Sequence, residues 1–207
     1  MIRPPGFIGV AFSERSDGDI RNHVAARGAL ASRLEVSEAW AEVSQVHGDH
    51  VVRVTAPGNR GEADALWTTE PGLPLAIFTA DCFGVALVAD DAVGVAHAGW
   101  RGAVSGVVPR LREEMSASGN DPRRAAVGPG IGSCCFEVGP EVAELFTDRA
   151  AVTSWGTTSV DLPAVLAGQL DGLETWKADG CTRHDPGWFS HRADGTSERL
   201  ASIVWLA

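Results

Sequence analysis

The stretch that most constrains the fold runs from Phe78 to Gly102 and reads FTADCFGVALVADDAVGVAHAGWRG. Its apolar runs, rich in β-branched and aromatic residues, predict buried strands, with a turn at Asp90-Asp91 between two of them. One apolar run ends at Cys82 and the next at His97. We therefore expect two chemically reactive side chains at the ends of adjacent strands.

A helix is expected directly after His97. The composition changes after Gly99, and apolar residues then recur at helical spacing until Gly119, which can end the helix: Val104, Val107, Val108, Leu111 and Met115. The strand-to-helix turn contains Arg101, and the first amides of a helix can hold an anion. This turn is thus a candidate anion site.

A second histidine comes from upstream. Residues 42–54, EVSQVHGDHVVRV, alternate apolar and polar residues on both sides of Gly48-Asp49, which predicts a tight hairpin with His47 beside its turn. One thiol and two imidazoles suit zinc or copper, and they equally suit acid, base or nucleophilic chemistry. Separations of 35 and 15 residues among His47, Cys82 and His97 mean that only the fold can assemble such a site. Packing roles for single Cys and His residues remain the alternative.

The rest of the chain predicts a mixed order of strands and helices in a single domain, 1–207, because no linker, repeat or low-complexity tract divides it. The expected elements are a strand near Phe7–Phe12, a helix near Ile20–Leu34, a segment around Ala63–Thr69, a Gly/Pro-shaped loop at Gly128–Gly132, helices from about Pro140 and over Asp161–Leu173, and a buried C-terminal segment.

Charge and hydropathy exclude several classes of partner. The formal net charge is −10, and Lys177 is the only lysine, so nucleic-acid binding is disfavoured. No apolar run approaches the roughly 20 residues that span a bilayer, and the N-terminus lacks a signal-peptide pattern. We expect a cytoplasmic protein that binds neither nucleic acid nor membrane.

The other cysteines, Cys134, Cys135 and Cys181, form no C-x-x-C motif, and an adjacent pair would be strained as a disulfide. We expect reduced thiols with packing roles. The remaining histidines show no paired ligand spacing: His23, His50, His184 and His191.

Six ordered blocks resemble one bacterial family: QVHG at 45–48, ADAL at 63–66, TADC at 79–82, HAGWRG at 97–102, GPGIGSCCFEVG at 128–139 and CTRHDPGWFSHRADG at 181–195. The chain is similar to YfiH-like laccase-domain proteins, long labelled multicopper polyphenol oxidases. Members of this family are now described as purine nucleoside phosphorylases with adenosine deaminase activity.

The resemblance implies an α/β fold, a layered α/β/β/α single domain of mixed sheets flanked by helices. It also implies that His47, Cys82 and His97 act as zinc ligands, with copper as an alternative metal, or as catalytic groups. Phosphate would be the co-substrate, bound by Arg27 and by the turn at Arg101. Asp81 could orient an imidazole, or could simply be a strand-end turn residue.

The implied reaction is attack of phosphate at C1′ of a purine nucleoside, which yields the base and ribose 1-phosphate. Adenosine, inosine, guanosine and methylthioadenosine all remain candidate substrates, and the oligomeric state stays open. The alternatives are a Cys/His-dependent hydrolase or amidase, a copper-dependent polyphenol oxidase, and a non-catalytic metal-binding scaffold.

Overall fold

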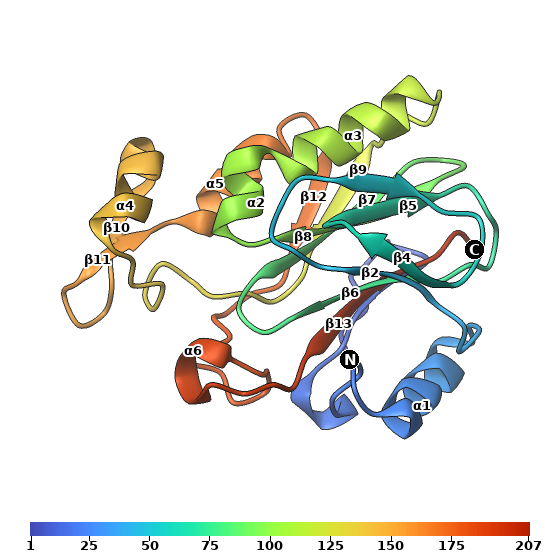
Figure 1. The fold of residues 1–207 in the computed structure, drawn as a ribbon, viewed down its shortest axis with the longest axis horizontal. Helices are drawn as coiled ribbons and strands as arrows, with labels where there is room; N and C mark the ends of the chain where they lie inside the picture. Colours follow the sequence, from blue (N-terminus) through green and yellow to red (C-terminus); the bar gives the residue numbers. More distant parts are fainter.

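Two mixed β-sheets face each other, and helices cover their outer faces, in a computed structural model that describes residues 1–207 (Figure 1). The first sheet has five strands in the order β1-β13-β6-β2-β4. These strands are β1 Val10–Phe12, β13 Leu200–Val204, β6 Leu75–Thr79, β2 Ala41–Ser44 and β4 Gly58–Glu62.

The second sheet has six strands in the order β12-β9-β7-β8-β5-β3. Their bounds are β12 Glu174–Lys177, β9 Arg124–Val127, β7 Phe83–Val88, β8 Val93–Ala98, β5 Ala65–Thr68 and β3 Val51–Arg53. A separate pair, β10 Ala150–Val152 and β11 Thr158–Val160, projects from the body together with α4 Pro140–Ala143 (Figure 1).

The helices lie on opposite sides of the sheet pair. Helix α1 Val24–Leu34 buries Leu30, Ala31 and Leu34 against the five-stranded sheet. On the other side, α2 Trp100–Ser105, α3 Val107–Ala117 and α5 Leu162–Gln169 cover the six-stranded sheet. The remaining helices are α6 His191–Asp194 and two 3₁₀ turns, Arg15–Asp17 and Glu144–Arg149. The predicted α/β/β/α layering is confirmed.

The apolar core between the two sheets explains why the predicted central strands are almost continuously hydrophobic. Side chains such as Ile77 of β6 and Val95 of β8 are fully buried in it. Because β7 and β8 are covered on both faces, they lack the alternation expected of half-exposed strands. Their turn at Asp90-Asp91 joins an antiparallel pair, as predicted.

Two local predictions were wrong. Residues 42–54 do not form a hairpin: β2 pairs with β4 and β6 in one sheet, and β3 pairs with β5 in the other, so the His47 segment crosses between sheets. The helix after Gly99 is broken into α2 and α3 by Gly106, whose φ of 82° is left-handed. No helix is long and apolar enough to cross a membrane.

Candidate functional site

The predicted trio His47, Cys82 and His97 comes together at one end of the sheet pair. Their ligand atoms all lie within 4.8 Å of one another, and the two imidazole rings meet edge to face at 4.7 Å. His97 lies on β8 opposite Gly84 of β7, and Cys82 directly precedes β7. The antiparallel pairing of these strands therefore brings the thiol to the imidazole.

Asp64, which the sequence interpretation did not single out, organises this trio. Its Oδ1 is 2.8 Å from His97 Nδ1, and its carboxylate accepts backbone N–H groups from Val46, His47 and Gly48 at 3.2, 2.9 and 2.6 Å. The carboxylate thus fixes residues 46–48, which cross between the two sheets, where the sequence had predicted a hairpin turn. The available signal was the lone acid of the ADAL block, placed directly before a fully buried strand.

Opposing shifts of pKa create an ion pair between Cys82 and His97 at neutral pH. Burial by itself would raise the pKa of Cys82, but hydrogen bonds and charge from His47 and His97 outweigh it and lower the pKa to about 6. Burial would lower the pKa of His97, but Asp64 and Cys82 raise it to about 9. The same contact with His97 lowers the pKa of Asp64 despite its burial. A thiolate, an imidazolium and a carboxylate therefore stand in a row.

Backbone strain is concentrated at this site. Among non-glycine residues, only Glu35, His47 and Asp81 have positive φ, and the latter two, at 65° and 93°, border the cavity. Such conformations cost energy and persist where the surrounding contacts enforce them.

Asp81 does not orient an imidazole, contrary to one of our two expectations. Its carboxylate accepts hydrogen bonds from Thr182 Oγ1 at 2.6 Å and from the backbone N–H of Arg192 at 2.7 Å. The strained turn at Asp81 is thus tied to the C-terminal segment that forms another wall of the site.

A cavity of about 430 Å³ opens beside the trio, within the size range of small-molecule sites. Four arginines that make no ion pair with a carboxylate line it: Arg21, Arg101, Arg192 and Arg199. Phe78, Trp100, Ile131, Phe136 and Leu162 supply apolar surface, and Gln45 and His191 add polar groups. In a chain of net charge −10, this local excess of cations favours an anionic ligand.

The two arginines predicted for phosphate lie in different places. Arg101 lines the cavity and stacks over Trp100 at 4.2 Å. Arg27 lies behind the cavity wall: its guanidinium is 2.9 Å from the Glu42 carboxylate and 5.5 Å from the centre of the Phe78 ring. The trio and Arg101 therefore share one cavity, whereas Arg27 does not line it.

A second group of metal-ligand residues lies on another part of the surface. Cys134, Cys135, Cys181 and His184, which we expected to have packing roles or no ligand partners, place their ligand atoms within 4.8 Å of one another. Cys181 and His184 are spaced C-x2-H, but their partners are 45 or more residues upstream, so tertiary structure alone assembles the group. These four residues can hold a metal ion.

Comparison with known proteins matches nearly the whole chain. The family model described as multi-copper polyphenol oxidoreductase laccase matches residues 10–207. "Purine nucleoside phosphorylase SCO2081" of Streptomyces coelicolor is 41% identical over 208 residues, covering 91% of this chain and 85% of the relative. "Purine nucleoside phosphorylase" of Deinococcus radiodurans is 37% identical, covering 97% and 83%.

Solved structures share the fold. The Bacillus licheniformis hypothetical protein YfiH superposes with a TM-score of 0.82 at 25% identity, covering 98% of this chain and 88% of that chain. YlmD from Geobacillus stearothermophilus gives a TM-score of 0.78 at 30% identity, covering 89% and 80%.

Proposed function

Since this chain belongs to the family described as multi-copper polyphenol oxidoreductase laccase, whose relatives include named purine nucleoside phosphorylases, we propose that it cleaves purine nucleosides with phosphate. The products are the free base and ribose 1-phosphate, and adenosine, inosine, guanosine and methylthioadenosine are the proposed substrates. The observation that carries the proposal is one cavity that holds unpaired arginines beside the Asp64–His97–Cys82 row.

We assign phosphate binding to the arginines that line the cavity. Guanidinium groups match phosphate oxygens geometrically and stay charged at every working pH. Arg101 keeps the role that we expected for it. Arg27 is held by Glu42 behind Phe78 and does not line the cavity, so we assign the phosphate contact to the cavity arginines and a wall-supporting role to Arg27.

The trio would supply the two other groups that the reaction needs, a negative charge near the ribose and a hydrogen-bond donor to the purine. Positive charge develops on the ribose as the glycosidic bond breaks, and the Cys82 thiolate supplies a fixed negative charge nearby. His47 is exposed to the cavity and donates a hydrogen bond to the departing purine. His97 is 2% exposed and holds the thiolate in its ionised form.

The donor set of the trio also fits zinc. Two imidazole nitrogens and a thiolate within 4.8 Å of one another form a three-residue set, which is typical of catalytic zinc with one open position. When bound, the metal would supply Lewis-acid chemistry and lower the pKa of water, as deamination of adenosine requires. We include adenosine deamination in the proposal on this ground.

A Cys/His hydrolase or amidase is the second candidate, because a thiolate beside an imidazolium is also an activated nucleophile. A covalent adduct on Cys82 after incubation with ester or amide substrates, detected by intact-protein mass spectrometry, would favour it. Copper-dependent oxidation through several copper centres fits less well, because the trio offers donors for one ion and multicopper oxidation needs many histidines.

The test is product analysis with inosine, with and without inorganic phosphate. We expect phosphate-dependent release of hypoxanthine and ribose 1-phosphate, and a loss of at least about 100-fold in kcat for Cys82→Ala and His97→Ala. The matched control is His50→Ala, whose imidazole contacts the Glu62 carbonyl outside the cavity and whose loss should leave turnover unchanged.

Adenosine is assayed in parallel for release of inosine and ammonia. Absence of turnover with all four purine nucleosides would contradict the proposal. A non-catalytic scaffold would instead be indicated if Cys82→Ala also sharply lowered the melting temperature through loss of a structural metal.

A further inference from the structure

The second group of metal-ligand residues, Cys134, Cys135, Cys181 and His184, lies apart from the proposed catalytic cavity. Cys134 and Cys135 follow the loop after β9, and Cys181 and His184 follow β12. None of the four lines the cavity beside the trio. Cys134, Cys181 and His184 border a different, open surface depression, and Cys135 is buried beneath it.

We propose that Cys134, Cys135, Cys181 and His184 bind one structural zinc ion, which fastens residues 181–199 to the loop at 128–139. In a tetrahedral site, zinc–sulfur and zinc–nitrogen bonds of about 2.3 and 2.0 Å place the ligand atoms roughly 3.5–3.8 Å apart. Cys134 Sγ lies 3.6 Å from Cys135 Sγ and 3.8 Å from His184 Nδ1, and Cys135 Sγ lies 3.3 Å from His184 Nε2. Only one His184 nitrogen would bind the ion, and the four ligand atoms lie within 4.8 Å of one another, so small side-chain shifts complete the tetrahedral site.

The chemistry of the group favours a cation over simple packing. The 3.6 Å between Cys134 Sγ and Cys135 Sγ is far beyond the roughly 2.05 Å of a disulfide, and the three cysteines of the group are free thiols. The fourth member is an exposed imidazole whose nitrogens both face sulfurs, which an apolar packing cluster would not select. The Gly132 N–H donates to Cys181 Sγ at 3.2 Å, a contact that supports a thiolate.

Three thiolates and one imidazole make a closed set of four, which distinguishes this site from the three-residue catalytic trio. Soft thiolate ligands select zinc over magnesium or calcium. The donor set therefore points to a structural ion with no open position for substrate.

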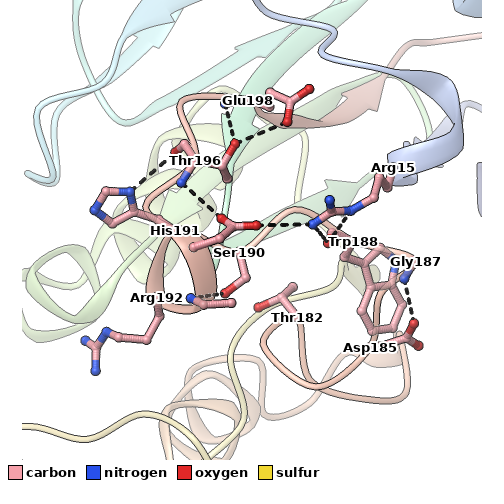
Figure 2. Close-up of polar contacts among 12 residues, drawn as sticks. Arg15, Thr182, Asp185, Gly187, Trp188, Ser190, His191, Arg192, Thr196 and Glu198 are labelled. Atoms are coloured by element: carbon pink, nitrogen blue, oxygen red, sulfur yellow. Dashed lines mark hydrogen bonds and ion pairs between the residues drawn. The ribbon is translucent and has the colours of Figure 1, made fainter.

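The local fold explains what the ion would do. Residues 178–199 contain only one short helix, α6, and Figure 2 shows several polar contacts that hold this segment. Arg15 donates to the Trp188 carbonyl at 3.1 and 2.9 Å, and Ser190 caps α6 by accepting the Ala193 N–H at 3.1 Å. Thr182, next to the cluster, reaches Asp81 at the cavity rim.

Both segments joined by the cluster supply cavity walls. Ile131 and Phe136 come from one segment, and His191, Arg192 and Arg199 come from the other. The ion would thus set the position of two cavity arginines without touching substrate. Loss of the ion should raise KM for phosphate severalfold while changing kcat less.

Metal content tests the proposal independently of turnover. Protein purified with zinc is assayed by elemental analysis, and cobalt-substituted protein is assayed for thiolate-to-cobalt charge-transfer absorption. We expect Cys181→Ser to lose one equivalent of zinc and most of the absorption relative to wild type. His184→Cys, which keeps four ligands, should retain both, and Cys82→Ala should retain the intense three-thiolate absorption.

A second measurement covers the case in which Cys181→Ser fails to fold. In wild-type protein, bound zinc should protect the partly exposed Cys134 from alkylation, and a chelator should raise its rate at least about tenfold, as read by peptide mass mapping. Equal rates with and without chelator, or equal zinc content in wild type and folded Cys181→Ser, would overturn the proposal.

Discussion

At the scale of residues, Asp64 has the widest influence on the site. It is fully buried, and it accepts hydrogen bonds from three successive backbone amides and from His97. One carboxylate thus fixes the strained conformation of His47 and the charge of His97 together.

Replacement of Asp64 should be costly because it leaves buried donors without an acceptor. We expect Asp64→Ala to lower the free energy of unfolding by about 3–5 kcal/mol, measured by urea denaturation. Asp90→Ala is the control, since Asp90 forms only an exposed ion pair with Arg123 at 3.6 Å, and its loss should leave stability unchanged. Equal stability of the two variants would contradict the role given to Asp64.

The ionisation of Cys82 provides a second prediction. Its pKa of about 6 lies below the ordinary thiol value, so the reactive thiolate is the minority form below pH 6 and the dominant form above pH 7. In zinc-free protein, the alkylation rate of Cys82 should therefore rise with pH through a midpoint near 6, as followed by peptide mass mapping.

Asp64→Asn should move that midpoint upward, because a neutral amide no longer favours the His97 imidazolium that stabilises the thiolate. An unchanged midpoint in this variant would show that the ion pair does not depend on Asp64.

At the scale of elements, the β8-to-α2 turn is shaped by what Gly99 lacks. A Cβ at Gly99 would lie 2.9 Å from Cys82 Sγ and 3.3 Å from His47 Cδ2, so only glycine lets this turn approach the trio. Gly106, at the other end of α2, has open space around it but a φ of 82°.

Substitutions at these two glycines should affect different properties, activity at Gly99 and stability at Gly106. Gly99→Ala should displace Cys82 and reduce phosphorolysis by at least about tenfold with the fold intact, since a misplacement of about 1 Å at a reacting group is costly. Gly106→Ala should instead lower the free energy of unfolding by about 1–2 kcal/mol and leave kcat unchanged. Paired kinetics and thermal melts of both variants check this, and the reverse pattern would contradict it.

The wrong prediction of a hairpin at residues 42–54 concerns the pairing of β2 and β3 with other strands. Alternation in residues 42–54 correctly indicated extended chain, but alternation does not specify the partner strand. The Asp64 carboxylate captures the amides that a tight turn would have used, so the two strands separate into different sheets.

At the scale of the whole molecule, the two sheets share one buried core, so neither can keep its inner face dry alone. We predict that residues 1–207 unfold as one unit at constant zinc content. Tryptophan fluorescence and far-ultraviolet circular dichroism should give coincident thermal transitions. Two resolved transitions would show that the sheets are separate domains.

The sequence by itself determined the buried β6–β8 strands and the reactive trio, because apolar runs and motif residues are local signals, whereas the layered α/β architecture followed from the family resemblance of the motif blocks. Only the tertiary structure placed Asp64 under His97, put Arg192 and Arg199 in the cavity wall, and gathered three cysteines and His184 from segments 45 or more residues apart. Those contacts depend on which loops meet at the sheet ends. Contacts between loops produce no periodic pattern of apolar residues in the sequence, whereas burial of a strand or of a helix face does.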